Sequence, residues 1–174
     1  YRLDGFGDRF FRKRIIGLQL AAYYVMEMIG GVLAGRALDN TTRSKRTNAY
    51  LVLSVFVVVT ALAFGAGGVL EYNAKSKPDA APTKVGFNSW AVLAPTATFL
   101  LWGFSDSQIQ SYTYWLIGAL YPTDAKERTR MIGFFKLTQS LGWCIGFAIV
   151  PAERCSDFVQ LLAQGTCFVL GTLI

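Results

Sequence analysis

The chain has 174 residues, of which 53% are hydrophobic and 16% are charged, and it contains no histidine. This balance leaves too little polar surface to cover a soluble core, and the apolar residues gather in long runs. The formal net charge of +6 comes largely from lysines and arginines in short loops between these runs, a pattern typical of membrane proteins that argues against a nucleic-acid partner.

The apolar runs predict five membrane-spanning helices, because a helix needs roughly 20 residues to cross the hydrocarbon layer. We therefore predict an all-α, polytopic transmembrane fold in contact with the lipid bilayer. A polar segment, 1–14, precedes the first span, and an exposed loop, 72–88, follows the second. The predicted spans are 15–38, 49–71, 89–121, 129–150 and 156–174.

The third predicted span is the longest, and it contains Pro95 and Gly103. A tilted, kinked helix fits this length, and a helix broken near Gly103 is the alternative. Small residues four positions apart in the first and fourth spans predict close packing of helix backbones. These pairs are Gly31 with Gly35 and Gly142 with Gly146.

Three ionisable residues fall inside predicted spans, where each charge costs on the order of 3 kcal/mol near the centre. Glu27 lies midway in the first span, Asp106 midway in the third, and Lys136 within the fourth. An intramembrane charge usually faces the bundle interior or a water-filled cavity. We therefore interpret these residues as candidates for a solute or proton pathway.

Helical spacing groups these charges with other polar and aromatic side chains. The predicted pathway residues are Glu27, Asp106, Gln110, Tyr114, Lys136 and Gln139. Tyr23 shares the face of Glu27, Thr113 that of Asp106, and Ser140 and Trp143 that of Lys136. A buried carboxylate–lysine pair that only holds helices in position is the alternative, and Lys136 could instead extend to the membrane interface.

The loop after the first span has a carboxylate at a helix end and cations just beyond it. Gly35, Asp39 and Arg43 could form a charge-assisted latch between neighbouring helix ends. A basic loop that only sets the membrane topology is the alternative.

An enzyme is not expected. The sequence has no nucleophile–base pair, metal-ligand cluster or phosphate-binding glycine loop, and the lack of histidine removes the commonest general base. Its three cysteines, Cys144, Cys155 and Cys167, lack metal-type spacing. The sequence therefore predicts no cofactor and no bound metal.

Several segments resemble one protein family. The spacing of Gly35, Asp39 and Arg43 resembles the cytoplasmic loop signature of the major facilitator superfamily, with Asn40 and Thr42 in place of the usual Arg and Gly. The runs GFSDSQIQSYTYWLIGAL (103–120) and GFFKLTQSLG (133–142) are similar to the tenth and eleventh helices of the "uncoordinated ninety-three"-like branch of that superfamily, especially its fungal members. Residues 29–39 resemble the end of its eighth helix.

This resemblance implies that the spans are helices eight to twelve of a twelve-helix fold, which is most of its C-terminal half. The N-terminal half of the same protein is then the missing partner, and we expect the chain to be a fragment. The resemblance also places the loops 39–48 and 122–128 in the cytoplasm, although the loop charge count alone favours the opposite orientation.

Two functions are consistent with the resemblance. The first is an ion-coupled secondary transporter of a small solute, in which Asp106 is the proton or cation site and Gln110 and Tyr114 line the path. The second is a non-transporting scaffold that regulates an ion channel or escorts receptors, as animal members of the family are thought to do. Either way we expect a multi-pass integral membrane protein.

Overall fold

The computed structural model describes residues 10–76, 90–149, 159 and 162–168. These residues form helices and no β-strand, which confirms the predicted all-α class. Outside the described residues lie residues 1–9 of the polar segment, residues 77–88 of the predicted loop and most of the fifth predicted span. The part of that span that is described, 162–168, is helical. The main elements are α2 (Lys13–Leu38), α3 (Lys45–Ser76), the 3-10 turn η1 (Trp90–Val92), α4 (Leu93–Leu120) and α5 (Ala125–Ile149).

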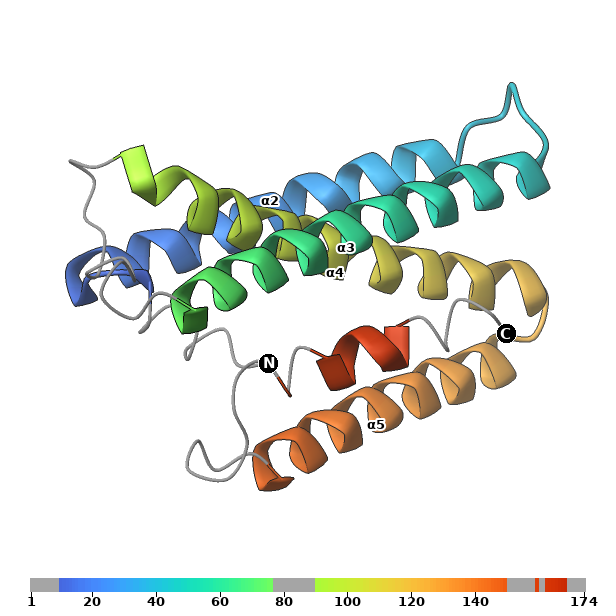
Figure 1. Ribbon diagram of the computed structural model, residues 1–174. Coiled ribbons are helices and arrows are strands. Elements are labelled where there is room, and N and C mark those ends of the chain that lie inside the picture. The colour runs from blue at the N-terminus through green and yellow to red at the C-terminus, as the bar shows by residue number, and fades with distance from the viewer. Residues whose placement is uncertain (1–9, 77–89, 150–158, 160–161, 169–174) are drawn as a thin grey trace.

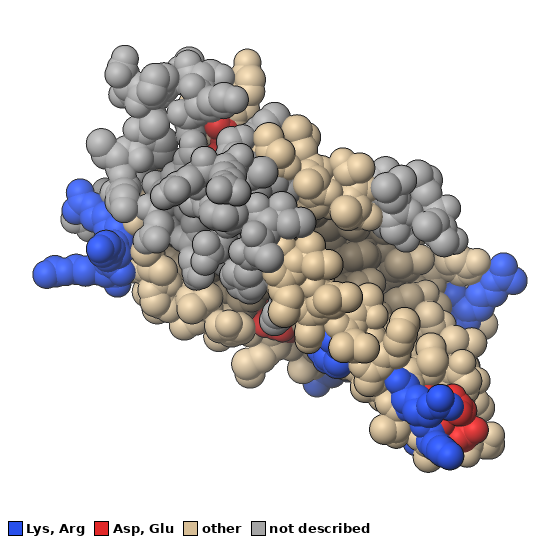
Figure 2. Space-filling model, turned by 90° about the horizontal axis from the view of Figure 1, so that it is seen from below, with Lys and Arg blue, Asp and Glu red and all other residues tan. Residues whose placement is uncertain are grey.

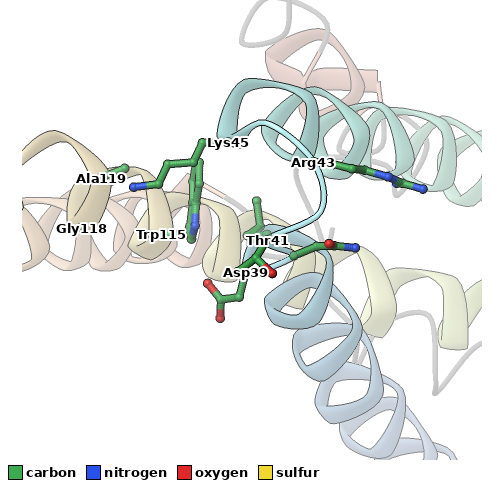
Figure 3. A pocket seen from close by; sticks show the side chains of 9 residues that line it. Asp39, Thr41, Arg43, Lys45, Trp115, Gly118 and Ala119 are labelled. Carbon is green, nitrogen blue, oxygen red and sulfur yellow. The ribbon is translucent and has the colours of Figure 1, made fainter.

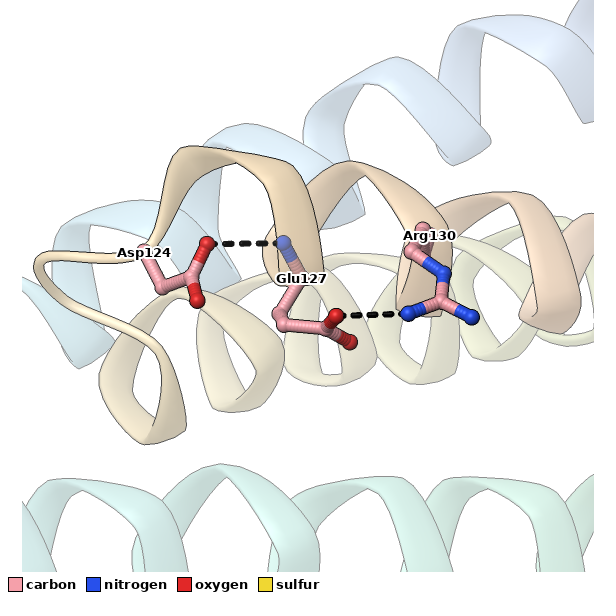
Figure 4. A network of polar contacts seen from close by, with 3 residues as sticks. All are labelled: Asp124, Glu127 and Arg130. Atoms are coloured by element: carbon pink, nitrogen blue, oxygen red, sulfur yellow. Dashed lines mark hydrogen bonds and ion pairs between the residues drawn. The ribbon is translucent and has the colours of Figure 1, made fainter.

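Helices α3 and α5 begin earlier than the hydrophobic pattern predicts, because each has a polar side chain at its N-terminus. Ser44 Oγ accepts a hydrogen bond from the backbone N–H of Thr47 at 3.1 Å, just before α3. Asp124 Oδ1 likewise accepts one from the N–H of Glu127 at 2.9 Å, and Glu127 pairs with Arg130 at 2.6 Å (Figure 4). Helix α3 also continues to Ser76, so residues 72–76 are helical rather than part of the predicted loop.

Helix α4 runs without a break past Gly103, so the predicted alternative of a helix broken at this point is wrong. Pro95 lies in its first turn, where a missing backbone N–H costs no helical hydrogen bond. The polar side chains of α4 therefore project from one uninterrupted helix.

Neighbouring helices alternate in direction, as Figure 1 shows. The turn between α2 and α3 and the turn between α4 and α5 lie at the same end of the molecule. Helix α4 packs most extensively against α2 and then α3, whereas its contact with α5 is smaller. Helix α4 is thus the element against which the others are positioned.

Two glycines allow α2 and α4 to approach closely. A Cβ added at Gly103 would lie 2.5 Å from the Tyr23 carbonyl oxygen, and one added at Gly30 would collide with the Ser107 side chain. Of the predicted close-packing positions, Gly31 lies against α4, where an added Cβ would be 3.6 Å from Ser111 Oγ, and Gly146 lies outside the residues whose surroundings are described. Among the described residues, no neighbouring atom lies within 4 Å of a Cβ added at Gly35 or Gly142, so no close contact is recorded at these two positions.

An aromatic core lies at the beginning of α2. Phe10 and Phe11 are 1% and 0% exposed, although the sequence places them in a polar segment. Phe11 meets Phe99 of α4 edge-on, with ring centroids 6.2 Å apart, and Tyr23 also packs against Phe99. This core attaches the start of α2 to α4.

The outer surface is apolar over much of its length. Leu62 is 59% exposed, and Val69 and Leu137 are also exposed. Helix α2 and the segment Lys45–Asn73 of α3 are long and apolar enough to cross a membrane. On the face shown in Figure 2, most of the coloured lysine and arginine side chains lie toward the ends of the molecule. Apolar sides with charged ends are the distribution that a bilayer favours.

Candidate functional site

A chain of hydrogen bonds joins α4 to α5 through a glutamine. Lys136 on α5 donates from Nζ to Oε1 of Gln110 at 3.0 Å. Gln110 donates in turn from Nε2 to Oδ2 of Asp106, one turn earlier on α4, at 3.2 Å. Lys136 also donates to Oε1 of Gln139 at 2.9 Å. An amide therefore lies between the carboxylate and the ammonium, in place of the direct ion pair considered as an alternative.

Two aromatic rings complete the surroundings of Lys136. Its Nζ lies 5.4 Å from the ring centroid of Tyr114 and 5.6 Å from that of Phe135. The two rings meet edge-on, with centroids 5.7 Å apart. At such distances the negative face of a ring attracts a cation. Lys136 thus points inward to α4 and does not extend to an interface.

A hollow of about 460 Å³ opens between α2 and α4 beside this chain of hydrogen bonds. Glu27 lies in its wall, close enough to Asp106 and Lys136 to interact electrostatically with both. Gln110 and Tyr114 belong both to the hollow and to the surroundings of Lys136. The structure therefore brings the six predicted pathway residues from three helices into one neighbourhood, called here the polar cluster: Glu27, Asp106, Gln110, Tyr114, Lys136 and Gln139.

Sequence reasoning missed part of the lining of this hollow, namely Tyr24, Met28, Ser107 and Ser111. Ser107 and Ser111 stand four residues apart on α4, which is the signal that could have identified them as one helix face. Tyr24 lines the hollow in place of Tyr23, which is 7% exposed and belongs to the aromatic core. The side chain of Trp143 lies outside the described residues.

Buried hydrogen bonds between helices hold the walls of the hollow in position. Gln108 Nε2 donates to the carbonyl oxygen of Gly30 at 2.7 Å, which ties α4 to α2. Ser105, one turn earlier on α4, is hydrogen-bonded through its hydroxyl to that of Thr60, which joins α4 to α3. A buried polar group without a partner is costly in an apolar environment, so these bonds favour one helix register over others.

The predicted loop latch between neighbouring helix ends stays a prediction. The side chains of Asp39 and Arg43 point in different directions in Figure 3, and the structure records no ion pair between them. Asn48 of α3 holds the turn, because its Nδ2 donates to the carbonyl oxygens of Leu38 at 3.2 Å and Asn40 at 2.7 Å. Gly35 contributes the carbonyl oxygen that accepts from the Asp39 N–H at 2.9 Å.

A second hollow, of about 570 Å³, lies at this end of the molecule between the α2–α3 turn and the end of α4 (Figure 3). Trp115 forms part of its wall, and Lys45 extends across it toward Ala119. The α2–α3 turn and the end of α4 are far apart in the sequence, and both line this hollow.

Two membrane-length helices, apolar outer faces and charges gathered between helices are features of a helical membrane protein. No family model matches the chain, and no solved structure matches it.

Curated relatives narrow this class. The chain is 26% identical over 151 residues to UNC93-like proteins 1 and 2 of Arabidopsis thaliana, and 25% identical over 176 residues to an UNC93-like protein of Schizosaccharomyces pombe. These matches cover 86% of this chain for the plant proteins and 100% for the yeast one, but the chain spans about a third of the length of these relatives, 32% or 34%. This homology supports the UNC93-like branch indicated by the sequence motifs.

Proposed function

We propose that the intact protein is an ion-coupled secondary transporter of a small solute, built on the major facilitator fold. In this proposal α2, α3, α4 and α5 are the eighth to eleventh helices of a twelve-helix protein. Asp106 is the coupling site, and Gln110, Tyr114 and Glu27 line the solute path.

The observation that carries this proposal is the polar cluster. Asp106 of α4 is hydrogen-bonded through Gln110 to Lys136 of α5, next to a hollow that contains Glu27 of α2. Charges inside a membrane protein are expensive and usually mark a pathway for ions or solutes. The glutamine between the charges can exchange partners when either helix moves, which suits a site that must open to two sides in turn.

The arrangement of the turns supports the major facilitator assignment. The α2–α3 and α4–α5 turns lie at one end of the molecule (Figure 1), and they are the two loops that the motif resemblance places in the cytoplasm. The alternation of helix direction and the motif thus agree on which loops share a side of the membrane.

The test is ion uptake by the full-length protein reconstituted in liposomes, comparing wild type with Asp106→Asn. We expect the variant to lose proton- or cation-coupled uptake, because the amide keeps the shape of the carboxylate and removes its charge. Asp124→Asn is the matched control, because asparagine caps a helix as well as aspartate does and Asp124 is remote from the polar cluster. It should transport as the wild type does.

A folded Asp106→Asn protein with full uptake would contradict the proposal. If folded wild-type protein shows no uptake of protons or cations, the scaffold function becomes the better explanation, and stable co-purifying membrane proteins would support it.

A further inference from the structure

The immediate surroundings of Lys136 form a binding site for an ammonium group. Two amide oxygens, from Gln110 and Gln139, accept its N–H groups at 3.0 and 2.9 Å. The rings of Tyr114 and Phe135 lie within 5.6 Å of its Nζ. Oxygen acceptors combined with aromatic faces are the features by which proteins recognise cations.

The charge of the polar cluster favours a cation over an anion. Glu27 places a carboxyl group in the wall of the hollow, and the second carboxyl group of the polar cluster, that of Asp106, is hydrogen-bonded to Gln110 of the same wall. Gln110 and Tyr114, which contact Lys136, also belong to the residues that line the hollow. A ligand in the hollow therefore meets Glu27 and the groups that already hold an ammonium.

The hollow also has an apolar side. Tyr24 and Met28 contribute to its wall beside Ser107 and Ser111. A ligand with one ammonium group and a compact apolar body matches this combination of wall residues.

We propose that the hollow binds a small primary amine in its protonated form, and that Lys136 is an internal cation that competes with it for Gln110 and Tyr114. This inference rests on the proposed transport function and names the chemical class of its solute. The amine's ammonium group pairs with Glu27 and takes over acceptor groups that Lys136 otherwise holds.

The test is the binding of radiolabelled tyramine, a primary amine with one aromatic ring, to purified full-length protein in detergent. Removing a competing positive charge should tighten binding, so we expect Lys136→Met to lower the Kd about ten-fold. Glu27→Gln should raise the Kd about ten-fold, because it removes the charge that pairs with the amine. Lys126→Met makes the same substitution at an exposed position at the start of α5 and should leave the Kd unchanged.

Each outcome decides the inference. Unchanged or weaker tyramine binding in a folded Lys136→Met protein overturns the inference. Wild-type tyramine affinity in Glu27→Gln also overturns it, and this second variant decides the question even if Lys136→Met does not fold. Binding of the anion lactate that is lost in Lys136→Met would make Lys136 an anion site and would also overturn it.

The same experiment separates this inference from the proposed transport function. If tyramine binds and both variants respond as expected, but liposomes show no ion uptake, the ligand class is supported and the transport function is contradicted. If ion uptake depends on Asp106 but tyramine does not bind, the transport function is supported and the ligand class is contradicted.

Discussion

Gly103 shows how a single residue determines the distance between two helices. A side chain at this position would meet the backbone of Tyr23, and a backbone atom cannot rotate away as the end of a side chain can. Tyr23 in turn packs against Phe99 in the aromatic core. The position of α2, and with it that of Glu27, thus depends on the absence of a Cβ at Gly103.

We predict that Gly103→Ala lowers the free energy of unfolding by about 1–3 kcal/mol, the usual cost of overpacking. Thermal unfolding of the full-length protein in detergent measures the effect. Gly118→Ala is the control in the same helix, because a Cβ there has open space. It should raise stability by about 0.5–1 kcal/mol, since alanine is the better helix former. Equal stability of the two variants would contradict the close contact.

At the scale of the elements, the turn between α2 and α3 is held by one buried amide. Asn48 is 2% exposed, and it satisfies carbonyl oxygens at the end of α2 from the beginning of α3. Carbonyl groups at a helix end have no partner within the helix, so a side-chain donor stabilises the turn. An uncharged side chain thus holds this turn, whereas the latch predicted from Asp39 and Arg43 stays a prediction.

We predict that Asn48→Leu destabilises this turn by about 1–3 kcal/mol, because buried carbonyl groups lose their donor. Hydrogen–deuterium exchange should become faster for the backbone amides of residues 39–48. Thr41→Ala, at an exposed position in the same turn, should leave exchange close to that of the wild type. Slow exchange that persists in Asn48→Leu would show that another contact holds the turn.

For the whole molecule, the alternation of helix direction predicts which turns share a side of the membrane. The turns that contain Thr41 and Thr123 lie at one end, whereas Trp90, which is 88% exposed, lies at the beginning of η1 at the other. If the helices cross the membrane, positions 41 and 123 share one side and position 90 faces the opposite side.

We predict this labelling pattern for single cysteines in sealed vesicles, after Cys144, Cys155 and Cys167 are replaced by serine. A membrane-impermeant maleimide should modify Thr41→Cys and Thr123→Cys from the same side and Trp90→Cys from the other. Labelling of position 90 together with position 41 would contradict the topology. The side that faces the cytoplasm also decides between the motif and the loop charge count.

The amino-acid sequence by itself determined the helical class, the approximate helix positions and the residues of the polar cluster. These follow from local rules, because hydrophobic length and helical spacing are properties of each segment alone. For the same reason the spacing predicted a shared face for Asp106 and Gln110. It could not foresee that Thr113 on that face donates to its own helix, at the Ile109 carbonyl oxygen 2.8 Å away.

The tertiary structure alone decided which glycines carry close contacts and how the charges meet. Within the described part of the chain, the closest glycine contacts between helices are at Gly30 and Gly103, because close approach depends on how the helices pack against one another and not on residue spacing. The same packing places Gln110 between Asp106 and Lys136 and selects Tyr24 over Tyr23 for the hollow. Contacts between residues far apart in the chain depend on the rotation and offset of whole helices, which no single segment specifies.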